Sequence, residues 1–458
     1  MKKKYTIIIM LFIAMIAKSQ VPNTLTRQDK IFGLSKIWQE VNYNFIYLER
    51  IDRVKWDSTY RVMIKTVQET KNDYEYYRVL QKFCAPLKDG HTFILLPKNI
   101  DSLVYTDMFG SYRIQLQNIG DKAIITHINE SKKGEVPIGS EIVEVNGLPT
   151  EEYINQFVAP FISSSTEFVL KDEGVEKLLT GLKGEKYKIK IVTPDGKSKT
   201  ITLIHDFTAE KEVYPPIQDK QLLDFRWYDN QIAYVALNSF RDPKIIELFL
   251  EKLPEIRKAK GLMIDLRCNQ GGNTVTGTGI LQYLTNDTIL YGAKSVTRNH
   301  MPSFKAWGRY VNPSDTSASE WAKKSLLMSQ DRYYYPFEYY PVTFKPSNQK
   351  INIPTVLLIG HKTFSAAEDF LIFADNQNHM IKIGENSHGS TGEPLMFELP
   401  GGGMALVCTI KNTFPDGREF VGFGVKPDIE VKPTLNDFIQ NNDPVLNRAI
   451  SYLKLEVK

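Results

Sequence analysis

The sequence predicts a mixed α/β protein with an N-terminal helical domain, a β-rich module and a C-terminal α/β core. Three changes in the spacing of apolar residues along the 458-residue chain lead to this prediction. Residues 20–98 have helical spacing, residues 99–210 have short strand-like runs, and residues 220–435 alternate apolar runs of strand length with helical patterns. A last helix is expected over residues 436–458. A chain of this length has room for several domains, each with a core.

Residues 1–19 have the layout of a secretory signal peptide. Lys2, Lys3 and Lys4 precede an apolar run from Tyr5 to Ala17, and Ser19 is a small residue at the expected cleavage point. The apolar run is shorter than the about 20 residues that a membrane span needs. We therefore expect an exported chain with no membrane span after cleavage, and an uncleaved anchor is the alternative.

Composition narrows the function classes. Removing residues 1–19 takes away four lysines and no acidic residue, so the formal net charge falls from +4 to 0. This balance gives no reason to expect nucleic acid or an anionic membrane as a partner. Cys84, Cys268 and Cys408 stand far apart in apolar surroundings, which indicates buried free thiols. The seven histidines form no pair at ligand spacing, so we expect no metal and no cofactor.

The helical domain ends in a turn that carries a histidine. Apolar residues recur at three- and four-residue steps from Thr26 to about Lys82. Pro86 and Gly90 then break the helix and leave His91 on a turn before a strand-like run over residues 92–96. A role for His91 in catalysis competes with a simple turn histidine bonded to backbone.

The β-rich module contains a stretch that resembles part of a PDZ domain. Residues 138–147 place a turn glycine before a strand that ends in an Asn-Gly turn. PDZ domains bind an extended peptide at the edge of a sheet. An ordinary β-hairpin in an unrelated domain is the alternative. The other strands of the module are expected at residues 112–116, 122–128, 187–192 and 200–204.

Two strand-to-helix turns of the C-terminal core carry residues suited to chemistry. In the first, the apolar run 262–267 leads to Gly271 and Gly272 before a helix expected near Thr274. Adjacent glycines can turn backbone N–H groups toward an anion at a helix N-terminus. This turn lacks the lysine and the glycine spacing of a P-loop, which disfavours nucleotide binding.

In the second turn, the apolar run 355–360 leads to Ser365, and Ala366 starts a helix. A serine here has its hydroxyl at the positive end of the helix dipole, and the Ala366 N–H is free to donate to a developing negative oxygen. A capping box, with Glu368 at the third helical position, fits the same spacing. From spacing alone the capping role is the better interpretation.

Three stretches occur in the order found in the C-terminal processing (tail-specific) peptidases and the tricorn protease core. They are Asp89–Thr92, Asp265–Arg267 leading to the two glycines, and Thr363–Glu368. The stretch Gly424–Val431 also resembles the closing motif of that family. The resemblance implies a serine-type endopeptidase with a PDZ-like domain and a ClpP/crotonase-like catalytic core, and it reverses the preference for a capping serine.

Carried across position by position, the resemblance implies that Ser365 is the nucleophile. The N–H groups of Ala366, Gly271 and Gly272 would then form the oxyanion hole. One branch of the family activates its serine with a lysine, but Ser390 holds that place in this chain. A Ser-Lys dyad is therefore not expected.

The tricorn-like branch uses a histidine, and His91 matches its Asp-Gly-His-Thr context. A neutral imidazole is also a suitable base near pH 7. His388, in the loop after the helix that follows the serine, is the rival base. The family's orienting glutamate falls nearest to Val421, so we choose Glu419, two residues earlier. Glu393 is an alternative, and a polar residue or water could hold the imidazole instead.

We therefore predict a peptidase that hydrolyses bonds in a peptide or protein substrate through acylation of Ser365. The signal and the family place it in a bacterial periplasm, with outward secretion as the alternative. The tyrosine-rich insertion 287–349 would be a lid or a substrate wall, or else a plain surface excursion. A non-catalytic binder of peptides or apolar ligands and a hydrolase of small esters or lipids are the competing functions.

Overall fold

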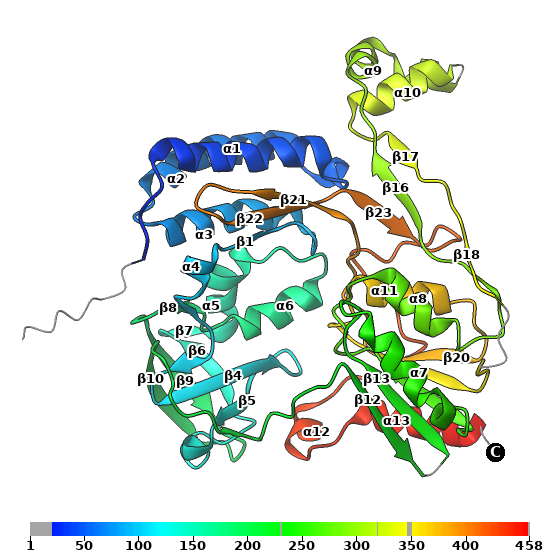
Figure 1. Ribbon diagram of the computed structural model, residues 1–458. Helices are drawn as coiled ribbons and strands as arrows, with labels where there is room; N and C mark the ends of the chain where they lie inside the picture. Colours follow the sequence, from blue (N-terminus) through cyan, green and yellow to red (C-terminus); the bar gives the residue numbers. More distant parts are fainter. Residues whose placement is uncertain (1–20, 230, 318, 346–349, 457–458) are drawn as a thin grey trace, which may run out of the picture.

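The computed structural model describes residues 21–456 except residues 230, 318 and 346–349. The predicted signal peptide, residues 1–19, lies outside the described residues. Within them, no helix combines the length and the apolar character that crossing a membrane requires. The predicted fold class is confirmed, because helices form the N-terminal region, a β-rich module follows, and an α/β core completes the chain (Figure 1).

The N-terminal region contains three long helices. They are α1 (Arg27–Asn44), α2 (Arg53–Glu69) and α3 (Asp73–Cys84). The side chains of Thr26, Asp52 and Asn72 cap them, since each accepts a backbone N–H of the first turn. Buried side chains such as Ile37 and Leu80 join the same hydrophobic cluster as residues of the C-terminal core. The helices therefore fold onto the core rather than standing apart from it.

A three-stranded sheet joins the two ends of the chain beneath these helices (Figure 1). Its order is β1 (Phe93–Leu95), β22 (Met404–Cys408) and β21 (Pro394–Glu398), all antiparallel. We expected the apolar run at residues 404–410 within the buried core sheet, but it pairs with β1 instead. Local apolar spacing identifies a strand without naming its partner, which explains the difference. The pairing holds His91, two residues before β1, against the C-terminal part of the chain.

The β-rich module is one sheet whose main path runs β10-β9-β6-β5-β4-β3, with β11 on β5 and β7 on β6. The strand bounds are β3 (Met108–Phe109), β4 (Tyr112–Asn118), β5 (Ala123–Asn129), β6 (Glu141–Val145), β7 (Leu148–Pro149), β9 (Lys186–Val192), β10 (Ser198–Ile204) and β11 (Val213–Tyr214). Helix α6 (Glu167–Glu176) packs against β4. Asn146 and Gly147 both have positive φ, at 52° and 87°, and form the expected turn after β6.

The core sheet has the order β12-β13-β14-β19-β20-β24. Its strands are β12 (Leu223–Tyr228), β13 (Ile232–Leu237), β14 (Gly261–Asp265), β19 (Thr355–Ile359), β20 (Met380–Gly384) and β24 (Ile429–Glu430). All neighbours are parallel except β12. Every residue of β14 and β19 is buried, as expected of strands covered on both faces.

Helices cover both faces of the core sheet. One face packs against α7 (Lys244–Ile256), α8 (Thr274–Leu281) and α11 (Ala366–Ala374), and the other against α13 (Pro444–Glu456). Helices α8 and α11 both begin at the carboxyl ends of central strands, directly after the two turns singled out in the sequence. Parallel sheets bind ligands at this edge. The smaller elements are α4 (Lys98–Asp101), α5 (Thr150–Tyr153), α12 (Leu435–Ile439), β2 (Val104–Tyr105) and β8 (Gly181–Leu182).

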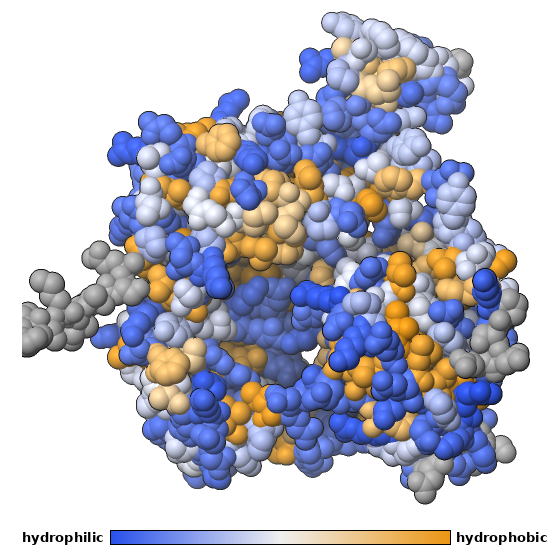
Figure 2. All heavy atoms as spheres, viewed as in Figure 1, coloured by the Kyte–Doolittle hydropathy of each residue, from blue (hydrophilic) through white to orange (hydrophobic). Residues whose placement is uncertain are grey.

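The insertion, residues 287–349, is partly an arm and partly a wall of the core. Helices α9 (Pro302–Trp307) and α10 (Glu320–Ser329) form the arm that projects at the top of Figure 1. At its base, β16 (Lys294–Arg298) pairs with β17 (Tyr334–Pro336) and with β23 (Ile410–Thr413). A second pair joins β15 (Ile289–Leu290) to β18 (Val342–Thr343). Figure 2 shows the same face of the molecule, hollowed between the β-rich module and the core.

Candidate active site

Ser365 lies on the sharp turn between β19 and α11. Its backbone has φ 58° and ψ −124°, a conformation that residues other than glycine rarely adopt. The expected capping box with Glu368 is present, and in it the Ser365 N–H donates to the Glu368 carboxylate at 3.2 Å. The Ser365 hydroxyl also lies near His91, with 3.3 Å between Oγ and the imidazole Nε2. Backbone strain at such a position is typical of functional sites.

His91 is buried and contacts a serine through each ring nitrogen. Its Nδ1 lies 2.9 Å from the Ser390 Oγ, opposite the nitrogen that faces Ser365. The Phe364 ring stacks on the imidazole, with 4.6 Å between the ring centroids. Burial lowers the pKa of His91 to about 4, so the ring is neutral at pH 7. With the proton on Nδ1 and Ser390 as its acceptor, Nε2 is free to accept the Ser365 hydroxyl proton.

Glu419, the sequence-based choice for the orienting acid, is not brought to His91. Its carboxylate forms ion pairs with Lys411 and with Arg50, and the Lys411 ammonium holds the pKa of Glu419 below its usual value. The contact to the imidazole Nδ1 comes from Ser390 instead. Opposite charges near Glu419 therefore hold it elsewhere, and a polar residue occupies the orienting position. Glu393 is exposed and also makes no hydrogen bond to His91 in the described structure.

A second buried acid, Asp89, lies beside this pair. Its Oδ2 accepts the Thr92 hydroxyl at 2.6 Å. Burial raises the pKa of Asp89 to about 6, while hydrogen bonding from Thr92, the His91 backbone and the Ser390 hydroxyl lowers it. Ser390 therefore contacts the imidazole, and its hydroxyl also lowers the pKa of this carboxyl group.

His388, the rival base, packs against Phe364, the same ring that stacks on His91. Its ring lies 4.2 Å from the Phe364 ring, centroid to centroid. Its Nδ1 is buried with no hydrogen-bond partner among the described residues, and the Ser365 hydroxyl bonds to His91. Burial lowers the pKa of His388 to about 3. The structure thus brings His91, and not His388, to the serine.

Glu368 is buried beneath Ser365 and accepts four hydrogen bonds. Its Oε1 accepts the Ser387 hydroxyl at 2.5 Å and the Gly389 N–H at 2.7 Å. Its Oε2 accepts the N–H groups of Ser390 at 3.1 Å and Ser365 at 3.2 Å. Burial raises the pKa of Glu368 to about 8, against the lowering effect of these four donors. One carboxyl group therefore fixes both the serine turn and the loop that carries Ser390.

The glycine turn after β14 packs directly against the serine turn. A Cβ on Gly271, which has φ 82°, would lie 2.6 Å from the Phe364 carbonyl oxygen and 2.8 Å from the Ala366 nitrogen. The Gly271 N–H is not available to a ligand, because it donates to the Asn269 Oδ1 at 2.9 Å. This differs from the expectation that Gly271 contributes to the oxyanion hole, since the Asn269 side chain turns back onto the loop.

Gly272 and Ala366 present the remaining N–H groups. Within the described residues, neither N–H has a hydrogen-bond partner, and both residues line the cavity next to Ser365. Asn269 holds the two turns together, as its carbonyl accepts the Phe364 N–H at 3.0 Å and its side chain donates to Leu237. Asn269 was not among the residues expected at the site, although an asparagine two residues before a pair of glycines is a turn signal.

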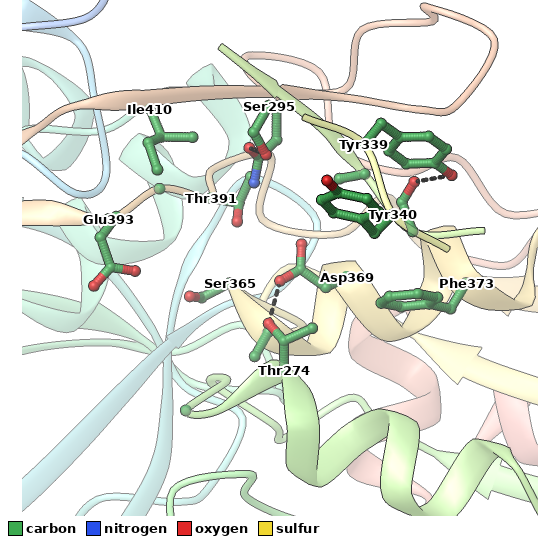
Figure 3. A pocket seen from close by; sticks show the side chains of 16 residues that line it. Thr274, Ser295, Tyr339, Tyr340, Ser365, Asp369, Phe373, Thr391, Glu393 and Ile410 are labelled. Carbon is green, nitrogen blue, oxygen red and sulfur yellow. Dashed lines mark hydrogen bonds between the residues drawn. The ribbon is translucent and has the colours of Figure 1, made fainter. Parts of the chain in front are cut away.

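The cavity beside Ser365 has a volume of about 310 Å³ (Figure 3). Its wall includes Tyr339 and Tyr340 from the insertion, so the insertion is a wall of this site. Helix α11 supplies Asp369 and Phe373 from the opposite side. In the described part of the chain, no cluster of His, Cys, Asp or Glu could hold a metal ion. A serine, a neutral histidine and two free N–H groups form the arrangement needed for acyl transfer to a serine.

Residues 231–431 match the model of peptidase family S41. This part of the chain, which contains Ser365 and the glycine turn, is similar to that family of serine peptidases. The resemblance found in the sequence is thereby confirmed. His91 precedes the matched range, so its place beside Ser365 rests on the geometry described above.

The solved structures of mature CPAF share the architecture along nearly the whole chain. Mature CPAF complexed with lactacystin has a TM-score of 0.68 and 14% identity, covering 94% of this chain and 98% of that one. Mature CPAF alone has a TM-score of 0.66 and 14% identity, covering 93% and 96%. The photosystem II D1 C-terminal processing protease has a TM-score of 0.46 and 15% identity, covering 88% and 93%. No curated protein sequence matches the chain. At 14% identity the likeness to CPAF is one of fold.

Proposed function

We propose that this protein is an exported endopeptidase in which Ser365 is the nucleophile and His91 the general base. The observation that carries the proposal is the 3.3 Å contact between the Ser365 Oγ and the His91 Nε2. These residues are 274 positions apart and come from different regions of the fold. Hydrogen-bond reach between a serine and a neutral histidine is the geometric requirement for this chemistry.

The reaction would follow the general course of serine peptidases. His91 Nε2 takes the Ser365 proton while Oγ attacks the peptide carbonyl carbon, and the N–H groups of Gly272 and Ala366 hold the oxyanion. The imidazolium then gives its proton to the leaving amine as the C–N bond breaks. Water, deprotonated by His91, attacks the acyl-enzyme and releases the carboxylic acid.

Ser390 takes the orienting position in this proposal. It accepts the Nδ1–H of His91, which fixes the tautomer that can act as a base. Asp89 is a buried acid beside this chain of groups, and the Ser390 hydroxyl lowers its pKa. Ser390 therefore stands where other serine peptidases place an orienting carboxylate.

The remaining parts of the proposal concern the substrate and the compartment. The β-rich module would act as a PDZ-like domain that holds an extended end of the substrate, as the turn geometry after β6 favours. Tail-specific cleavage and export through residues 1–19 belong to the same proposal. Fractionation of cells that produce the full chain would test export, and a cytoplasmic product of uncleaved mass would contradict it.

The decisive test is labelling with an alkyl fluorophosphonate, read by intact mass of the purified protein. We expect one adduct on the wild type and none on Ser365→Ala or His91→Ala. His388→Ala is the matched control, and it should still be labelled because His388 does not contact Ser365. A folded wild-type protein that gains no adduct would contradict the peptidase mechanism and favour a binding role for the scaffold.

A further inference from the structure

The cavity beside Ser365 opens directly from the two free N–H groups. Gly272 and Ala366 line it together with Ser365, so a carbonyl held for attack places its neighbouring side chain at the cavity mouth. Figure 3 shows Asp369 pointing from α11 into the cavity, one turn beyond Ser365. Four residues of helix span about 6 Å along the axis. Asp369 therefore lies at the depth that a long side chain would reach.

The charged side chains that line the cavity are both acidic. Asp369 at the base and Glu393 at the exposed rim are carboxylates, and among the described residues no lysine, arginine or histidine lines the cavity. Outside the lining, the ammonium of Lys294 lies 5.6 Å from the centroid of the Tyr339 ring. A cavity of this kind favours a positively charged ligand group.

Asp369 has an unused hydrogen-bond acceptor. Its Oδ2 accepts the Thr274 hydroxyl at 2.6 Å. Its Oδ1 is buried and has no hydrogen-bond partner among the described residues. A buried carboxylate oxygen that accepts no hydrogen bond raises the free energy of the protein. A ligand N–H that donates to this oxygen would remove that cost. Burial also raises the pKa of Asp369 to about 6, while the hydroxyls of Thr274 and Thr391 lower it.

The walls suit an aliphatic stem. Phe373, Tyr339 and Tyr340 present aromatic rings, and Gly292 keeps the passage open because a Cβ there would lie 2.3 Å from the Phe373 ring. The Tyr339 hydroxyl donates to the Gly292 carbonyl at 3.2 Å and holds the ring in place. Lysine and arginine bury their methylene stems against apolar surfaces and keep the charged end for a polar partner.

We propose that this cavity binds the lysine or arginine side chain of the residue whose carbonyl Ser365 attacks, and that Asp369 determines this specificity. The inference rests on the proposed function and names its substrate class, peptides cleaved after a basic residue. An apolar side chain would leave the Asp369 Oδ1 without a donor, and an acidic one would face two carboxylates.

Covalent probes test the proposal without knowledge of the full cleavage sequence. Two α-aminoalkyl diphenyl phosphonates would be compared, one with a lysine side chain and one with a leucine side chain, by labelling rate on the purified protein. We expect the lysine probe to react about 10- to 100-fold faster, the range for a hydrogen bond to a charged group. Equal rates, a faster leucine probe or no reaction with the lysine probe would overturn the proposal.

Two variants identify the residue responsible. Asp369→Asn keeps the shape and the Thr274 contact but removes the charge, and the ratio of lysine to leucine rates should fall to about 1. Glu393→Gln, at the exposed rim, should change that ratio by less than about threefold because solvent screens its charge. An unchanged ratio in Asp369→Asn would overturn the role of Asp369.

A side-chain-free fluorophosphonate separates the two levels of inference. If it labels Ser365 while the lysine probe shows no advantage, only the specificity proposal fails. If it does not label the folded protein, the proposed function itself fails.

Discussion

The first turn of α11 has two faces, and each carries one buried carboxyl group. Glu368 accepts hydrogen bonds from four protein donors, and every one belongs to the serine turn or to the loop of Ser390. Asp369, the next residue, accepts one from Thr274, and its other oxygen has no hydrogen-bond partner in the described part of the chain. Successive residues of a helix point about 100° apart, so neighbours can serve different surroundings. The number of protein donors, and not burial alone, separates a structural acid from one available to a ligand.

The largest expected difference is in stability. Glu368→Ala leaves three backbone N–H groups and the Ser387 hydroxyl buried without their acceptor, and should lower the free energy of unfolding by at least about 3 kcal/mol. Asp369→Ala, its matched partner, should change it by less than about 1 kcal/mol. Urea denaturation of both variants measures the comparison. Equal destabilisation would remove the distinction between the two faces.

The fit of the glycine turn against the serine turn gives the next prediction. Gly271→Ala places a Cβ against the backbone of Phe364 and Ala366, so we expect the fluorophosphonate labelling rate to fall about 100-fold or more, the effect of losing an oxyanion donor. Gly147→Ala is the control, because it has a similar φ of 87° and nothing near its would-be Cβ. Equal labelling of the two variants would show that the close approach has no catalytic importance.

Ser390 and Glu419 offer a direct contrast between the structure and the sequence-based choice. Ser390→Ala removes the acceptor of the His91 Nδ1–H, and labelling should slow about 10- to 100-fold while the protein stays folded. Glu419→Gln removes an acid paired with Lys411 and should alter the rate by less than about threefold. A large loss in Glu419→Gln with little effect in Ser390→Ala would restore the glutamate as the orienting group.

The smallest effect is expected from moderate changes of pH. Burial holds the pKa of His91 near 4, so the imidazole stays neutral as the pH falls from 8 to 5. The labelling rate should therefore fall to half of its value at pH 8 only near pH 4. Asp89, Glu368 and His388 are titratable groups near this ring or near the serines that contact it. Labelling rate against pH, with circular dichroism to confirm folding, measures the profile. A midpoint near 6.5 would mean that the imidazole is solvated.

The sequence predicted the elements better than their partners. Helical spacing, the strand before Ser365 and the turn at His91 depend on residues close in the chain, and the structure has all of them. The pairing of β22 with β1 joins positions more than 300 residues apart, so local spacing contains no information about it. That Ser365 should face His91 was indicated only by the family resemblance, because no pattern of apolar residues connects them.

The errors at the site have the same origin. Glu419 was chosen by its distance from a motif, but its surroundings depend on Arg50, which lies in the short turn between α1 and α2. Ser390 was noted for replacing a lysine, and its contact with His91 depends on a loop that the buried Glu368 holds. The Asn269 side chain accepts a hydrogen bond from the N–H of Gly271, two residues later in the chain, so that N–H cannot bind an oxyanion. Only atomic positions decide such competition for hydrogen-bond donors.

The separation of 274 residues between His91 and Ser365 affects when the chain becomes active during its synthesis and transport. On the proposed mechanism, a growing or translocating chain has no complete catalytic pair until the segment around Ser365 has emerged and packed against residues made long before. Contacts this distant in sequence form late, since a long loop must close first. The peptidase would thus be silent throughout its own synthesis and transport, and its activity would report completed folding.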